Sequence, residues 1–116
     1  MLGLTGTKFG CGVEKCHACL VWIDGSPEES CEKSIGEVVG KRLITIEGLS
    51  GVAAGAAIQQ AFIDHAAVQC GYCTPGFLMA GAKLLEEHPH PTREQIEQSI
   101  SGNLCRCTGY YKIIDA

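Results

Sequence analysis

Eight cysteines in a chain of 116 residues constrain its fold more than any other feature. They form two separate groups of four. The first group has the spacing C-x4-C-x2-C and a distant fourth member, and comprises Cys11, Cys16, Cys19 and Cys31. The second combines a C-x2-C with a later C-x-C, and comprises Cys70, Cys73, Cys105 and Cys107. Because each half of so short a chain buries little apolar surface, a sulfur-based staple is expected.

The first group has the spacing of a 2Fe–2S centre. C-x4-C-x2-C with a distant cysteine is typical of plant-type ferredoxins. The closely spaced cysteines would wrap one side of a cluster, and Cys31 would close the other. Gly10 and Gly12 allow backbone N–H groups to approach the sulfurs and to stabilise their negative charge. The second group offers two thiolates from each of two short turns, so the sequence predicts two clusters with four cysteines each.

The number and spacing of the cysteines allow three other uses. Disulfides fit the even number and the short chain, but the two cysteines of a C-x-C are poorly placed to bridge each other. Structural zinc often uses C-x2-C, although the remaining spacings match zinc sites poorly. A thioredoxin-like site would need a βαβ pattern around C-x2-C, which the sequence lacks. A zinc-stapled interaction module without a redox role therefore remains as the alternative to clusters.

Charge and hydropathy exclude two classes of partner. The chain has nine Lys and Arg residues and 13 Asp and Glu residues, which give a net charge of −4. No run of basic residues offers a nucleic-acid surface. No stretch approaches the roughly 20 apolar residues that span a bilayer, so no direct membrane span is expected. The first residues, MLGLTG, have neither the basic nor the apolar region of a signal peptide.

The hydrophobic pattern changes near residues 49–51. Before this point, residues 18–23 and 43–47 read as strands, and Asp24-Gly25 as a tight turn. After it, apolar residues recur at helical spacing from residue 54. Thr74 is expected as the N-cap of a helix with Pro75 at its first position, and Thr92 with Gln95 as a capping box. A last helix is expected from Thr108, so domains of 1–49 and 50–116 are predicted.

Longer motifs make the chain similar to a known family. They are LTGTKFGC at residues 4–11, TIEGL at 45–49, VQCGYCTPG at 68–76 and GNLCRCTGY at 102–110. Together they resemble the iron–sulfur small subunit of molybdenum hydroxylases, the group of xanthine dehydrogenase, aldehyde oxidoreductase and isoquinoline oxidoreductase. The resemblance implies an α+β fold, in which a ferredoxin-like β-grasp lobe precedes a four-helix bundle that binds the second 2Fe–2S cluster.

The resemblance also implies a function and partners. A large subunit would hold a molybdenum–molybdopterin cofactor and oxidise an aldehyde or an N-heterocycle. This chain would be the electron-transfer subunit of that oxidoreductase, with no substrate site of its own. Its second cysteine group would form the inner cluster near the molybdenum, with Gln69 and Cys107 contacting the molybdopterin. Its first group would form the outer cluster, which passes electrons to a flavin subunit or a cytochrome. We expect a cytoplasmic protein, or a periplasmic one if it is exported with its large subunit.

The chain departs from the family pattern at two places. The family usually has glycine between the second and third cysteines of the first motif, where this chain has His17. Its backbone is expected to be either ordinary or strained, and its side chain to lie at the surface near the outer cluster. The family also has a few dozen residues before LTGTKFGC, so the β-grasp lobe is expected to be truncated and to expose a sheet edge. A shortened chain, a start at an internal Met, and a gap covered by the partner remain open explanations.

Overall fold

The structure is a computed structural model, and it describes residues 2–52 and 54–116. Its sheet has three antiparallel strands in the order β2-β1-β3, which are β1 (Leu20–Ile23), β2 (Ser26–Glu29) and β3 (Leu43–Ile44). Asp24 and Gly25 both have positive φ, of 50° and 85°, which is the geometry of the tight hairpin turn between β1 and β2. The first predicted strand and its turn are therefore confirmed.

The second predicted strand is shorter than expected. Strand β3 has two residues, and the chain then enters a 3-10 helix at Ile46–Gly51. A local cause is visible at Glu47, whose Oε1 accepts hydrogen bonds from the N–H groups of Thr5 and Gly6, at 3.0 and 2.7 Å. Its Oε2 accepts from the Thr45 hydroxyl at 2.6 Å. These bonds turn the segment toward the N-terminal chain and away from the sheet.

The helices are α1 (Ile35–Val38), α2 (Gly55–Asp64), α3 (Thr74–Glu87), α4 (Arg93–Ser99) and α5 (Tyr111–Asp115). The capping box of α4 is confirmed: the Thr92 hydroxyl accepts from the Gln95 N–H, and the Gln95 side chain accepts from the Thr92 N–H. Two predicted starts were wrong. Thr74 is the first residue of α3, and Cys73 is its N-cap. The last helix begins at Tyr111, because Tyr110 has a left-handed φ of 71° that cannot continue a helix.

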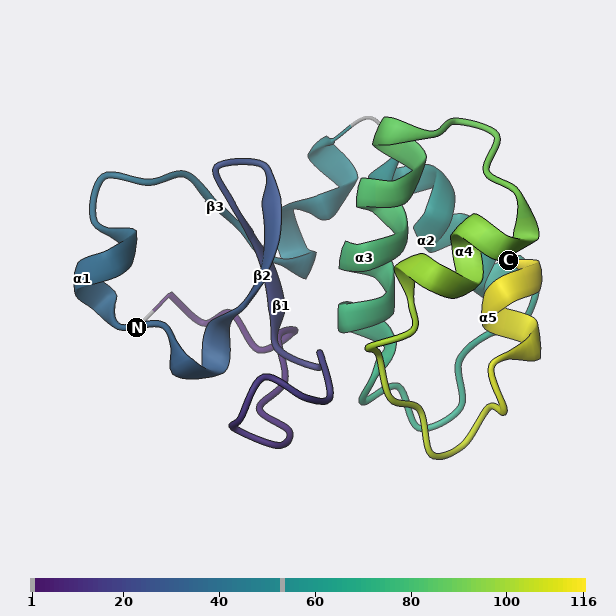
Figure 1. The fold of residues 1–116 in the computed structure, drawn as a ribbon, viewed down its shortest axis with the longest axis horizontal. Helices are drawn as coiled ribbons and strands as arrows, with labels where there is room; N and C mark the ends of the chain where they lie inside the picture. The colour runs from purple at the N-terminus through teal and green to yellow at the C-terminus, as the bar shows by residue number, and fades with distance from the viewer. Residues whose placement is uncertain (1, 53) are drawn as a thin grey trace.

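Helix α3 lies between the sheet and the other long helices (Figure 1). Its interior face packs on β1, whose four residues are all buried. The indole N–H of Trp22 donates to the carbonyl of Met79 in α3 at 2.9 Å, in a buried hydrogen bond. One apolar core consequently runs across the boundary expected at residues 49–51, and it includes Leu20, Trp22, Leu49, Ile58, Phe62, Phe77, Met79, Ile100 and Ile113. Trp22 belongs to this core and is almost completely buried.

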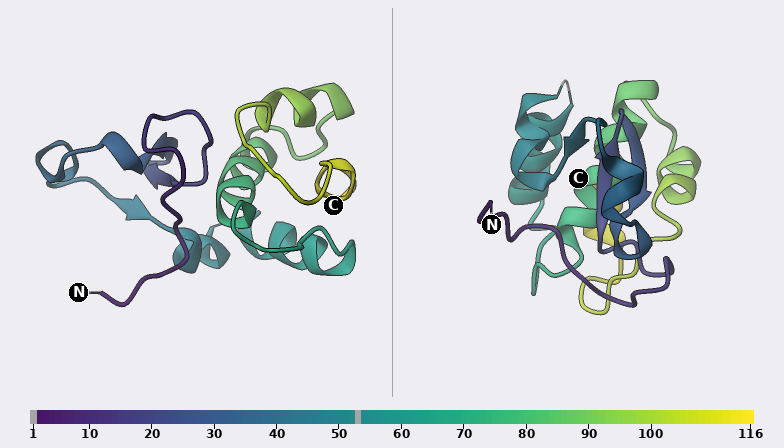
Figure 2. Two further views of the ribbon diagram at one scale, coloured as in Figure 1. Left: turned by 90° about the horizontal axis from the view of Figure 1, so that it is seen from below. Right: turned by 90° about the vertical axis from the view of Figure 1, so that its left-hand side faces the viewer.

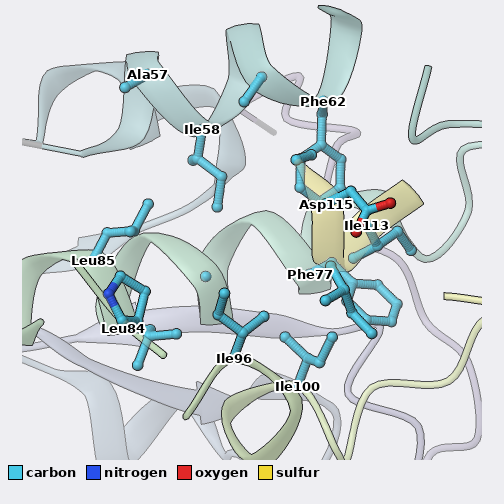
Figure 3. Close-up of a pocket in the computed structure, with 15 residues that line it drawn as sticks. Ala57, Ile58, Phe62, Phe77, Leu84, Leu85, Ile96, Ile100, Ile113 and Asp115 are labelled. Atoms are coloured by element: carbon cyan, nitrogen blue, oxygen red, sulfur yellow. The ribbon is translucent and has the colours of Figure 1, made fainter. Parts of the chain in front are cut away.

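The helices line an apolar pocket of about 350 Å³, partly open to solvent, on the side of α3 away from the sheet (Figure 3). Ile58 and Phe62 of α2 point into it from one side, and Ile96 and Ile100 of α4 from the other. The final residues, Ile113 to Ala116, close one end. None of the described helices is long and apolar enough to cross a bilayer. The fold as a whole is a small sheet combined with helices.

Candidate metal centres

The first cysteine loop turns its backbone N–H groups toward sulfur. The Cys11 Sγ accepts from the N–H of Val13 at 3.4 Å and of Lys15 at 3.2 Å. The Cys16 Sγ accepts from the N–H of Cys11 at 3.3 Å. Donation from Val13 and Lys15 lowers the pKa of Cys11 from 9.0 to about 7. This loop therefore favours the thiolate, the form that binds a metal.

Glycine at position 10 is required by the close approach of the loop to Cys16. A Cβ on Gly10 would lie 2.5 Å from the Cys16 Sγ, which is too close for any side chain. The expectation that glycine admits the backbone near sulfur is met at this position.

The other two cysteines of the first group meet beside the sheet. Cys19 is almost fully buried directly before β1. Its carbonyl accepts from the N–H and the hydroxyl of Ser30, at 3.3 and 2.8 Å, which brings the next residue, Cys31, to it. The two thiols are in hydrogen-bond contact, and burial is the main cause that raises the pKa of Cys19.

The second group also forms two pairs, Cys73 with Cys105 and Cys70 with Cys107. Burial, followed by the contact with Cys105, raises the pKa of Cys73 to about 12. Burial also raises the pKa of Cys105, but the hydroxyl and N–H of Thr108 outweigh it and leave that pKa lowered. These two donors lie 3.0 and 3.3 Å from the Cys105 Sγ.

The pairing of the thiols bears on the kind of metal group that they could hold. All eight cysteines are free thiols. A 2Fe–2S group takes two protein sulfurs at each of two irons. Four pairs of thiols, with N–H and O–H donors aimed at the sulfurs, have the donor set of two such groups.

Comparison with known proteins agrees with this chemistry. A family model described as "[2Fe-2S] binding domain" matches residues 45–116. The nicotinate dehydrogenase small FeS subunit of Eubacterium barkeri is 45% identical over 111 residues, which are 96% of this chain and 71% of that protein. The nicotine 6-hydroxylase small subunit of Paenarthrobacter nicotinovorans is 46% identical, over 97% of this chain and 68% of that protein. The structure of quinoline 2-oxidoreductase from Pseudomonas putida 86 superposes with a TM-score of 0.90 at 44% identity, over 98% of this chain and 70% of that one.

This chain belongs to the family of small iron–sulfur subunits of molybdenum hydroxylases. The iron–sulfur subunit is thus a component of an oxidoreductase, as the motifs predict. Its ligand assignment remains a prediction, supported by the cysteine geometry described above.

In the right-hand view of Figure 2, the loop before β1, the loop between α2 and α3 and the loop between α4 and α5 lie along the same lower edge of the iron–sulfur subunit. The N–H of Leu104, next to Cys105, donates to the carbonyl of Cys16 at 3.1 Å. The Tyr72 hydroxyl, between Cys70 and Cys73, donates to the carbonyl of Phe9. Two hydrogen bonds therefore join the loop of the first cysteine group to both turns of the second. Spacing within the sequence gave no signal for either bond.

His17 differs from its expected surface position. Its φ is 55°, so the strained alternative applies. Its side chain is only 29% exposed, and Nε2 lies 3.3 Å from Oε1 of Glu29. The imidazole packs against Gly102, close to the second cysteine group, and the histidine is not a free surface residue. Gln69, by contrast, is exposed directly before Cys70.

Proposed function

We propose that this chain relays electrons one at a time from a molybdenum centre on a large partner subunit to an external acceptor. When bound, each 2Fe–2S cluster would supply a site that takes up and releases a single electron. Cys11 with Cys16, and Cys19 with Cys31, would hold the outer cluster. Cys70 with Cys107, and Cys73 with Cys105, would hold the inner one.

The observation that carries the proposal is the contact between the two cysteine loops. Two hydrogen bonds connect the ligand-bearing segments, one from the Leu104 N–H to the Cys16 carbonyl and one from the Tyr72 hydroxyl to the Phe9 carbonyl. The chain thus holds two predicted redox sites in one rigid packing arrangement and has no need of a substrate pocket between them. This is the architecture that an electron relay requires.

The inner end of the relay is proposed to face the large subunit. Cys70, Cys107 and Gln69 are exposed, as are the apolar side chains of Tyr72 and Leu104 beside them. Exposed apolar groups around polar ones are typical of a surface that a partner covers. There the amide of Gln69 would donate to and accept from the molybdopterin, and Cys107 would approach it most closely.

The substrate class of the whole enzyme is proposed from its relatives. The names of those described above refer to nicotinate, nicotine and quinoline, all of which are N-heterocycles. We therefore favour an N-heterocycle over an aldehyde as the substrate of the large subunit. A flavin subunit or a cytochrome would take the electrons from the outer cluster.

Metal analysis of the subunit purified with its partner tests the proposal. We expect about four irons and four acid-labile sulfides per chain, and two distinct EPR signals after reduction. Cys31→Ser should remove one signal and Cys73→Ser the other. A colourless chain with two zinc ions would refute the redox role and support the zinc-stapled module. For the inner end, Gln69→Ala should slow reduction of the clusters by substrate while both remain assembled, and an unchanged rate would remove the role of Gln69.

A further inference from the structure

His17 has a positive φ, a backbone conformation that the Cβ of its side chain disfavours. A φ of 55° places a residue with a Cβ in the left-handed region, which is sterically unfavourable for any residue other than glycine. The surroundings hold it there. Its carbonyl accepts from the N–H of Leu20 at 3.4 Å and lies 3.5 Å from the Nδ2 of Asn103. Helix α3 also passes close to this carbonyl, because a Cβ added to Gly76 would lie only 2.2 Å from its oxygen.

The side chain of His17 is held on two sides. On one side Nε2 lies 3.3 Å from Oε1 of Glu29, at the end of β2. On the other, a Cβ on Gly102 would lie 2.2 Å from Cε1 of the imidazole and 2.7 Å from both of its nitrogens. Position 102 therefore accepts only glycine while the imidazole is in place. The ring thus lies between Glu29 of the sheet and the segment that leads to Cys105.

The contact between the His17 imidazole and Gly102 joins the two cysteine groups, in addition to the hydrogen bond between their backbones. His17 stands between Cys16 and Cys19, and Gly102 stands three residues before Cys105. The hydrogen bond from the Leu104 N–H to the Cys16 carbonyl lies in the same region. Any shift of the imidazole must therefore move one loop relative to the other.

We propose that His17 is a positioning residue, whose imidazole, held between Glu29 and Gly102, fixes the first cysteine loop against the segment that carries Cys105. The inference rests on the proposed function, because the purpose of this fixed geometry is to keep two clusters at one separation. Glycine at position 17 would relieve the backbone strain but would remove the contact between the imidazole and Gly102. The strained backbone of His17 is therefore accompanied by a defined contact between the two loops.

A cycle of four proteins tests the proposal: wild type, His17→Gly, Gly102→Ala and the double variant, each purified with the partner subunit. The readouts are the EPR line shape and midpoint potential of the outer cluster, identified as the signal that Cys31→Ser removes. Gly102→Ala should shift both, although residue 102 belongs to the inner segment. In the His17→Gly background the same substitution should cause no further shift, since no imidazole remains to be displaced. Gly36→Ala, whose nearest neighbour would be the Ser34 Oγ at 3.9 Å, is the matched control.

The outcomes separate this inference from the proposed function. An equal shift from Gly102→Ala in both backgrounds, or no shift in either, would overturn the role of His17. If Gly102→Ala fails to assemble its clusters, assembly in the double variant supports the proposal, and failure in both refutes it. If the wild type lacks two 2Fe–2S signals, the proposed function fails instead. Melting temperatures over the same cycle then test the contact alone: the loss caused by Gly102→Ala should disappear once His17 is glycine.

Discussion

Gly76 provides a direct test of the packing between α3 and the first cysteine loop. It is buried in the first turn of α3, where alanine would ordinarily stabilise the helix by about 0.5–1 kcal/mol. In this structure the new Cβ would lie 2.2 Å from the His17 carbonyl oxygen and 3.2 Å from the Nδ2 of Asn103. Because the nearest atom is backbone, relief requires α3 or the loop to move, and overpacking of this kind costs roughly 1–3 kcal/mol.

The net effect expected for Gly76→Ala is a loss of about 0.5–2 kcal/mol in the free energy of unfolding, after the helical gain of roughly 0.5–1 kcal/mol is subtracted. For a chain of this size, in which 1 kcal/mol shifts the melting temperature by about 4 °C, the melting temperature should fall by roughly 2–8 °C. Circular dichroism at a fixed scan rate measures it, with cluster content held equal by visible absorbance. Gly36→Ala, in α1 with open space around it, should instead leave the melting temperature equal or higher. If Gly76→Ala behaves like Gly36→Ala, the close approach of α3 to the loop is incorrect.

Three further changes test other contacts. Donation from the Thr45 hydroxyl and the Gly6 N–H lowers the pKa of Glu47 from 4.5 to about 2. The contribution of this carboxylate to folding stability is therefore complete above pH 4.5 and is lost as the pH falls toward 2. In chemical denaturation, Glu47→Gln should be less stable than wild type near neutral pH, with the difference shrinking over that interval; a constant difference would contradict the assignment. Trp22→Phe loses the indole hydrogen bond and part of the core volume, and should cost about 2 kcal/mol in urea unfolding. Thr92→Ala removes the cap of α4 and should cost about 1 kcal/mol, whereas Thr92→Ser should not.

Features with a local physical cause could be predicted from the sequence. The run LVWI followed by Asp24-Gly25 specifies a strand and a tight turn within six residues. The capping box at Thr92 and the end of α3 before Pro89 likewise depend on near neighbours. The cysteine spacings and the longer motifs led to the family, which the comparisons confirm.

The features that escaped prediction depend on residues far apart in the chain. The segment after Ile44 leaves the sheet because Glu47 binds N–H groups about forty positions earlier. His17 is partly covered by Glu29 on one side and Gly102 on the other, and neither contact follows a periodicity in the sequence. The start of α5 was misplaced because Tyr110 adopts a left-handed φ, which turns its hydroxyl onto the Cys105 N–H at 3.0 Å.

The core that runs from Trp22 through α3 to Ile113 limits how such a subunit can evolve. The sheet and the helices are not independent domains, since each contributes apolar side chains to the same core. A recombination event that replaced only one half would have to bring a matching face for β1 and α3, together with small residues at positions 76 and 102. Descendants of this chain are therefore expected to diversify at the exposed rim and to inherit the joint between the halves as a single unit.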